Sequence, residues 1–149
     1  MSEIRIVPVA QRHRADWDRL YAGYAAFYGV AQTPEMRDRV WSWLHDPAHA
    51  TEGLIAQDAE GGAVGLAHYR AFARPLSAST GGYLDDLFVD ARARGRRTAD
   101  ALIGALAEEG RRRGWSVIRW ITAEDNARAR AVYDRVAKPT PWRTYDIPL

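Results

Sequence analysis

The chain contains no cysteine, which excludes a disulfide framework, a thiol nucleophile and thiolate metal ligands. Long apolar runs are also missing, and no stretch approaches the ~20 residues that a membrane-spanning helix needs. The N-terminus lacks an apolar segment between a basic start and a small-residue cleavage site, which a secretory signal requires. These absences predict a cytoplasmic protein with no membrane partner.

Lysine is nearly absent: Lys138 is the single lysine among 21 basic residues, and all the others are arginine. A guanidinium group offers a planar fork of donors that suits phosphate, but a genome rich in arginine codons explains the count more simply. The net charge is only +2, and no recognition helix or stacking motif accompanies the arginines, so no nucleic-acid partner is expected. The positions of the arginines are more informative than their number.

The four histidines show no spacing typical of a metal site. His45 and His49 are four residues apart, but the Asp46-Pro47 step between them breaks the helix that would bring both onto one face. The sequence therefore predicts no bound metal.

Length and composition fit one globular domain over residues 1–149, with 47% hydrophobic and 27% charged residues. Apolar residues at helical spacing, and alternating or continuous apolar runs, predict the elements along it. Helices are expected over residues 16–28, 33–46, 98–113 and 126–136, strands over 4–9, 53–57, 63–73, 83–89, 116–122 and 142–147, and a loop over 75–82.

The order of these elements indicates the fold class. Closely spaced strands early in the chain favour antiparallel pairing, whereas the strand at 83–89 is followed by a helix and another strand, which predicts a parallel β-α-β crossover. We expect an α+β fold: a mixed, mostly antiparallel twisted sheet with helices on both faces.

The segment from Tyr83 to Gly114 carries the clearest chemical signal. An apolar strand leads into a turn with four arginines, and a helix begins at once at about Thr98. The first turn of a helix presents unpaired N–H groups and a partial positive charge, so it attracts anions. Arginines add charge-assisted donors. A solvated basic surface is the plainer interpretation, but the strand-turn-helix context favours a pyrophosphate site.

This segment resembles the GNAT superfamily of acetyl-CoA-dependent N-acetyltransferases, whose cofactor motif is Q/R-x-x-G-x-G/A between a strand and a helix. The match runs from Arg94 to Ala99 and departs at Arg97, where the family usually has glycine. Glycine lets the backbone approach the pyrophosphate closely. Arg97 therefore points outward, joins the phosphate contacts, or weakens cofactor binding.

The resemblance covers nearly the whole chain and is closest to the polyamine and histone acetyltransferase branch. It is carried by residues 16–21 and 26–28, the strand at 83–89, and residues 125–133. It implies the GNAT fold, acetyl-CoA as cofactor, and a strand edge that pairs with the pantetheine arm. The implied cofactor-binding residues are Leu87, Phe88, Val89, Arg94, Gly95, Arg96, Arg97, Thr98, Ala99 and Asn126.

Acetyl transfer to an amine requires loss of a proton from the amine and gains from a proton on the leaving thiolate. Tyr133 lies seven residues, or about two helical turns, after Asn126, so the two share a face. It matches the tyrosine that protonates the sulfur in the family. The alternative is a tyrosine of the core.

Two adjacent carboxylates interrupt the apolar strand, and burying such groups without a purpose is costly. Alternation places Tyr83, Asp85 and Leu87 on one face and Leu84 and Asp86 on the other. The polyamine-acetylating relatives have an acidic residue at the position of Asp85, which implies a base acting through water or an anchor for the cationic acceptor. Asp86 is expected to bind a backbone amide or an arginine such as Arg119.

The acceptor pocket is expected between the first helix and the third strand. Tyr24 and Tyr28 belong to an aromatic stripe that could bind an amine through its ring faces, although at least half of the stripe is expected in the core. His68, with Tyr69, could line the same cleft.

The function predicted from these features is acetyl transfer from acetyl-CoA to a primary amine, by direct attack in a ternary complex. The amine is a small or polyamine-like molecule or a lysine side chain. The alternative is an acyl-CoA sensor with little or no turnover, which Arg97 favours. A homodimer is also expected, since the amphipathic strand predicted at 142–147 could pair across subunits.

Overall fold

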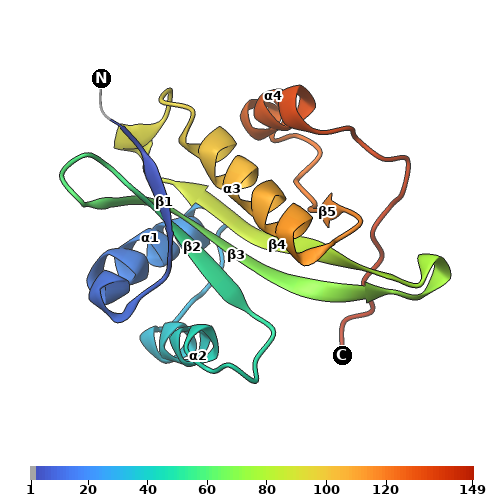
Figure 1. The fold of residues 1–149 in the computed structure, drawn as a ribbon. Helices are drawn as coiled ribbons and strands as arrows, with labels where there is room; N and C mark the ends of the chain where they lie inside the picture. The colour runs from blue at the N-terminus through green and yellow to red at the C-terminus, as the bar shows by residue number, and fades with distance from the viewer. Residues whose placement is uncertain (1–2) are drawn as a thin grey trace.

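The computed structural model describes residues 3–149, which build one five-stranded sheet (Figure 1). The strands lie in the order β1-β2-β3-β4-β5, and the first four pair antiparallel while β5 runs parallel to β4. Their bounds are β1 (Arg5–Pro8), β2 (Glu52–Gln57), β3 (Ala63–Arg74), β4 (Ser79–Val89) and β5 (Ile118–Arg119). The mixed, mostly antiparallel sheet and its parallel crossover confirm the predicted fold class.

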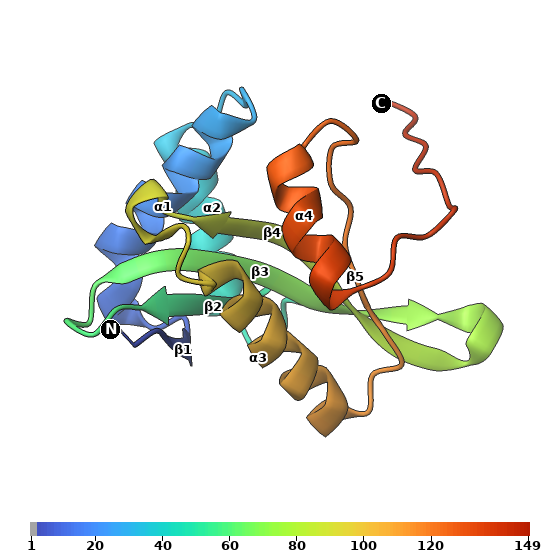
Figure 2. The same cartoon turned by 90° about the horizontal axis from the view of Figure 1, so that it is seen from above.

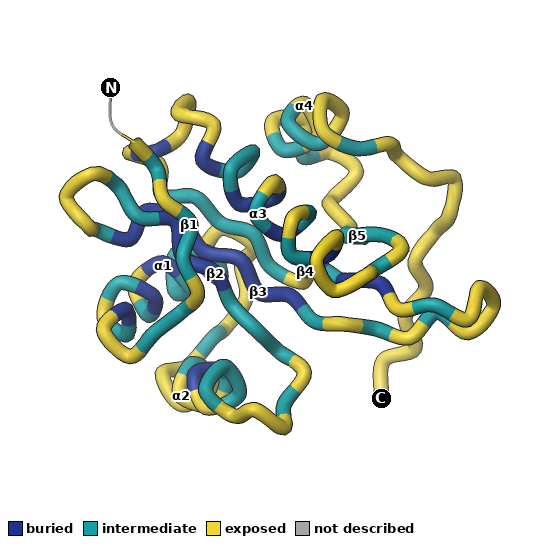
Figure 3. Tube along the Cα trace, in the orientation of Figure 1, coloured by how far each residue is buried: buried dark blue, intermediate teal, exposed yellow. Residues whose placement is uncertain are grey.

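Two helices cover each face of the sheet (Figures 1 and 2). The helices are α1 (Arg14–Phe27) and α2 (Pro34–Leu44) on one face, and α3 (Thr98–Arg113) and α4 (Ala127–Val136) on the other. Each face of the sheet has its own hydrophobic core. The most buried strands, β2 and β3, lie between the two cores (Figure 3). No helix within residues 3–149 is long and apolar enough to cross a membrane.

The helices follow their local sequence signals closely. Thr33 caps α2 by accepting a hydrogen bond from the N–H of Met36 at 3.2 Å, and Pro34 occupies the first turn. Gly114 ends α3 with a φ of 75°, a left-handed conformation that glycine adopts without strain. The glycine cap explains why α3 ends at the residue expected from the sequence.

The loop expected at 75–82 is wrong. A short 3-10 turn (Pro75–Ser77) is followed directly by β4 from Ser79, so β3 and β4 form a long hairpin. Its two glycines serve close packing: a Cβ on Gly82 would lie 2.4 Å from the Trp115 ring. The small residues that suggested a loop include Gly82, whose lack of a side chain lets the Trp115 ring pack against the strand.

The strand expected at 142–147 is also wrong. Residues 137–149 form no strand, and the C-terminal segment does not join the sheet (Figures 1 and 2). Trp142 and Tyr145 are 80% and 87% exposed. The strand expected at 116–122 is shortened to the two residues of β5, so there is little edge for a further strand to pair with.

Candidate active site

The site is built around the open edge of β4. β5 pairs with β4 only at Gly82 and Tyr83, so from Leu84 to Val89 this edge has no neighbouring strand within residues 3–149. An unpaired edge presents N–H and C=O groups that can bind another extended chain. The divergence of β5 from β4 thus creates a slot suited to a long, narrow ligand.

A β-bulge at Asp85 sets which side chains face each side of that slot. His68 pairs with Asp86 and Tyr69 with Leu84, so Asp85 is an extra residue in β4. The bulge changes the alternation: Leu84 packs in the core beneath α3, whereas Asp86 reaches His68 on the α1 side. The expectation that Leu84 and Asp86 share a face is therefore wrong, because the extra residue reverses the parity of the strand.

A cleft of about 340 Å³ follows the open edge, with walls from α1, β4, the start of α3 and α4. Its lining combines aromatic and aliphatic side chains with a few polar groups. The predicted site residues that line it are Tyr24, Tyr28, Leu87, Phe88, Val89, Arg94, Ala99, Asn126 and Tyr133. It shares Val89, Arg94 and Ala99 with a second cavity of about 440 Å³ at the start of α3. Most of the residues predicted for the site thus line one continuous groove, whereas Asp85, His68 and Arg96 line neither of its two cavities.

The turn before α3 has the geometry of an anion site. The first bond of the helix runs from the Ala101 N–H to the Arg97 carbonyl at 3.0 Å, and no side chain caps the helix start. The N–H groups of the preceding residues therefore have no helical acceptor. Gly95 has a φ of 83°, and a Cβ there would meet nothing within 4 Å, so its backbone conformation is what requires glycine.

Arg97 adopts the conformation that a glycine would normally supply. Its φ is 58°, a left-handed value that costs a non-glycine residue on the order of 1 kcal/mol. Its side chain is 78% exposed and lies 3.9 Å from the Asp100 carboxylate. Of the three alternatives for Arg97, the structure supports the outward one: Arg97 borders the cavity at the start of α3, and its side chain is largely exposed to solvent.

Thr98 and Arg128 complete the groove in ways that differ from the sequence-based expectation. Thr98 is buried and its hydroxyl donates to the Ala93 carbonyl at 3.2 Å, so this side chain braces the turn. Arg128 was missed, although it lines both cavities. The signal for it was its position four residues before Val132, which places both on the groove face of α4.

Tyr133 is half-buried in the groove and holds its proton firmly. Burial raises the pKa of its hydroxyl to about 12, with a further contribution from Tyr28. Its ring packs edge-on against Trp120 with 5.4 Å between centroids. Asn126 caps α4 through its side-chain oxygen, which accepts from the Ala129 N–H at 3.3 Å, so the amide NH₂ can donate into the cleft.

The two carboxylates of β4 have different surroundings. Asp85 is partly exposed and accepts a hydrogen bond from Arg70 Nε at 3.0 Å. Asp86 is largely enclosed: its Oδ2 lies 2.8 Å from His68 Nδ1 and accepts from the Tyr21 hydroxyl at 2.9 Å. The expectation of a backbone amide or Arg119 as its partner is wrong.

His68 links Asp86 to the core and does not line the cleft. Its Nε2 accepts from the Trp17 indole N–H at 2.9 Å. Since an indole nitrogen can only donate, the proton of this imidazole is on Nδ1, facing Asp86. Burial would raise the pKa of Asp86, but the hydrogen bonds from His68 and Tyr21 outweigh it and lower the pKa. The expected role of His68 in an acceptor pocket is therefore corrected. His68 is only 1% exposed, and it holds the Asp86 carboxylate in place through a hydrogen bond.

Three comparisons relate this chain to known proteins. The model of the Acetyltransferase (GNAT) family matches residues 17–137. The D-amino-acid N-acetyltransferase HPA3 of Saccharomyces cerevisiae is 30% identical over 125 residues, which cover 83% of this chain and 78% of the yeast protein. A ribosomal-protein-alanine N-acetyltransferase from Brucella melitensis biovar Abortus 2308 is 25% identical, with a TM-score of 0.78, over 99% of this chain and 100% of that one.

A fold match extends to a structure that contains coenzyme A. The aminoglycoside N-acetyltransferase AAC(6')-Iy, in complex with CoA, has a TM-score of 0.83 at 18% identity, over 99% of this chain and 96% of that one. The open edge of β4 and the uncapped start of α3 suit the pantetheine and pyrophosphate of such a cofactor. The chain belongs to the GNAT family and is an acetyl-CoA-dependent N-acetyltransferase.

Proposed function

We propose that the groove binds acetyl-CoA with its pantetheine arm along Leu87–Val89 and its pyrophosphate at the turn from Arg94 to Ala99. The observation that carries this proposal is the continuity of the open β4 edge with the uncapped start of α3. Arg94 and Arg128 line both cavities and supply positive charge to the phosphates. Asn126 donates its amide NH₂ to the cofactor.

The acetyl group passes directly to a primary amine in a ternary complex. Acetyl-CoA supplies an activated thioester, so no covalent intermediate on the protein is needed, and the described residues include no thiol. Tyr133 donates its proton to the departing sulfur. A pKa raised to about 12 keeps that proton available across the neutral range.

The amine loses its proton to a carboxylate of β4, directly or through water. Asp85 is the first candidate because it is partly exposed beside the open edge, while its pairing with Arg70 lowers its availability as a base. Asp86 is the second candidate, held by His68 and Tyr21 on the α1 side. Replacing each by asparagine distinguishes them. Loss of the base should lower kcat and remove the ionisation that makes the rate fall at low pH.

The acceptor is a small amine. The yeast relative is a D-amino-acid N-acetyltransferase, which makes amino acids candidates beside the polyamine-like molecules and lysine side chains expected from the sequence. The test is to measure thiol release from acetyl-CoA with D- and L-amino acids, spermidine and a lysine-containing peptide. Turnover with at least one class is expected. Tight CoA binding with no turnover on any acceptor would instead favour a sensor domain.

A further inference from the structure

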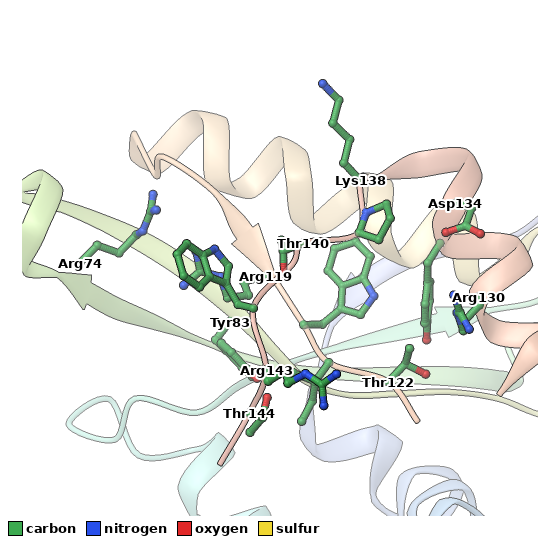
Figure 4. Close-up of a pocket in the computed structure, with 15 residues that line it drawn as sticks. Arg74, Tyr83, Arg119, Thr122, Arg130, Asp134, Lys138, Thr140, Arg143 and Thr144 are labelled. Atoms are coloured by element: carbon green, nitrogen blue, oxygen red, sulfur yellow. The ribbon is translucent and has the colours of Figure 1, made fainter. Parts of the chain in front are cut away.

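A third cavity adjoins Tyr133 next to the cofactor cleft. It measures about 590 Å³ and is bounded by β4, β5 and the chain just after it, the end of α4, and the C-terminal segment (Figure 4). Tyr133 lines both this cavity and the cleft along β4. A molecule in this cavity therefore has access to the same tyrosine that lines the cofactor cleft.

The cavity is strongly basic. Its lining contains five cationic side chains and a single carboxylate, that of Asp134. The five cations are Arg74, Arg119, Arg130, Lys138 and Arg143. Within residues 3–149 none of them forms an ion pair, although most arginines elsewhere on the molecule do. Clustered cations without counter-charges create a positive potential that attracts an anion.

Two of these five cations donate hydrogen bonds to other residues of the protein. Arg74 donates to the Ser116 hydroxyl at 2.7 Å and Arg130 to the Glu124 carbonyl at 2.8 Å. Arg119 lies over the Phe72 ring at 5.6 Å from its centroid, an arrangement that leaves the edge of the guanidinium open. Lys138 points away from the other side chains in Figure 4.

Arg119 and Arg143 are the two arginines of this lining for which no side-chain hydrogen bond is found within residues 3–149, unlike Arg74 and Arg130. Arg119 is the strand partner of Tyr83 and lies at one end of the cavity, whereas Arg143 enters from the C-terminal segment between that end and α4 (Figure 4). Arg130 and Asp134 lie at the other end, on α4 (Figure 4). The guanidinium groups of Arg119 and Arg143 are free to provide the forked donors that a carboxylate accepts, and Tyr133 lines the same cavity.

We propose that this cavity holds the acceptor and that Arg119 and Arg143 bind its carboxylate, so that the preferred substrates are amines that also carry a carboxylate, namely free amino acids. The inference rests on the proposed acetyl transfer at Tyr133 and names the acceptor class for it. The carboxylate end is fixed by the two arginines, and the amine end extends toward Tyr133 and the acetyl group.

The same charge pattern selects against polycations. A polyamine brings several ammonium groups into a cavity whose lining has five cations, and like charges repel. The positive surroundings also disfavour the protonated form of the acceptor amine, which lowers its pKa and increases the share of the neutral, nucleophilic form. The cavity thus contributes to both the choice and the activation of the amine.

The test compares acceptors that differ only in the carboxylate. CoA release from saturating acetyl-CoA is measured with both enantiomers of phenylalanine, with 2-phenylethylamine, and with spermidine. At least one phenylalanine enantiomer is expected to have a kcat/KM roughly 10- to 100-fold above that of 2-phenylethylamine, the range for hydrogen bonds to a charged group. Spermidine is expected to be the poorest acceptor.

Two substitutions connect the preference to the residues. Arg143→Gln and Arg119→Gln are each expected to lower the ratio of kcat/KM for phenylalanine to kcat/KM for 2-phenylethylamine by about tenfold, since only phenylalanine loses a carboxylate contact. Arg143 lies in an exposed segment, so its replacement does not endanger folding. Arg111→Gln removes the same charge from the exposed end of α3 and is the matched control, with no change expected.

Three results would overturn the inference. The first is a wild-type enzyme that acetylates 2-phenylethylamine or spermidine as well as it does phenylalanine. The second is an equal loss on phenylalanine and 2-phenylethylamine in the two variants. The third is an absence of turnover with every amine, which contradicts the proposed function as well, whereas the first two leave acetyl transfer intact.

Discussion

At the scale of single residues, Tyr133 carries the chemistry. Tyr133→Phe removes the hydroxyl and keeps the ring that packs on Trp120, so folding is expected to be unaffected. We expect kcat to fall about 100-fold or more, the usual contribution of a general acid, with little change in the Kd for CoA. Steady-state kinetics and thermal unfolding of both proteins check this.

The pH dependence gives a second view of the same residue. Because the pKa of Tyr133 is raised to about 12, its acid form persists well above neutral pH. The wild-type rate should therefore show no fall due to tyrosine ionisation as the pH rises to about 10. A Tyr133→Phe variant with wild-type kcat across that range would show that the proton comes from elsewhere.

The two carboxylates of β4 should differ in their contribution to stability. Asp86 has a lowered pKa, so its charged form stabilises the fold above the ordinary aspartate pKa, and this contribution is lost as the pH falls through the folded-state value. Asp86→Asn is expected to reduce the free energy of unfolding by about 1–3 kcal/mol at pH 7, since the buried His68 and Tyr21 donors lose a charged acceptor.

Asp85→Asn is the matched control. Its ion pair with Arg70 is solvent-accessible, and such pairs contribute roughly 0–1 kcal/mol. Urea unfolding measures both variants at pH 7 and at a series of lower pH values, and the deficit of Asp86→Asn should shrink only below the ordinary aspartate pKa of 3.8. Equal effects of the two substitutions would contradict the buried network.

The sequence predicted single residues unevenly. The groove residues from Leu87 to Ala99 could be placed because a local strand-turn-helix segment contains them. The contact of Trp17 with His68 could not, since 51 residues separate them and both belong to apolar patterns. The bulge at Asp85 could not be predicted from the sequence either, because it depends on the register in which β3 pairs with β4.

At the scale of elements, the turn before α3 is the critical segment. Arg97→Gly is expected to increase stability by roughly 1 kcal/mol or slightly less, since glycine adopts the left-handed conformation without strain. The same change should alter the Kd for CoA little, because the Arg97 side chain is in solvent. Chemical denaturation and calorimetric titration with CoA measure the two quantities.

Arg94→Ala is the comparison for that experiment. Arg94 lines both cavities of the groove, so its loss should weaken CoA binding about tenfold, the effect of one charge-assisted hydrogen bond. If Arg97→Gly weakens binding more than Arg94→Ala does, Arg97 takes part in phosphate binding and turns inward when the cofactor is present.

Elements were predicted well where their ends carry local signals. Thr33-Pro34 and Gly114 mark helix ends by their own chemistry, so α2 and α3 were found. A strand forms only where a neighbouring strand can pair with it. Polar and apolar residues alternate over 142–147 as in a strand, but β5 has only two residues and is too short to pair with them. Gly81 and Gly82 suggested a loop because the ring of Trp115, far along the chain, cannot be anticipated from them.

At the scale of the whole molecule, the C-terminal segment is the least covered part. Its apolar side chains at Trp142, Tyr145, Ile147 and Leu149 are all at least 80% exposed. Apolar groups in such an array favour association. The homodimer expected from the sequence stays a prediction: light scattering at micromolar concentration should give twice the chain mass of 16.7 kDa, and the mass of one chain after removal of residues 141–149. A monomeric full-length chain would contradict it.

The arrangement of the molecule around one open strand edge is the central claim, and hydrogen exchange with and without CoA tests it most directly. If the pantetheine pairs with β4 and the pyrophosphate sits at the start of α3, CoA should slow amide exchange at Phe88 and Val89 and from Gly95 to Ala99. Bound CoA that leaves these amides unchanged and protects a different surface would contradict the account.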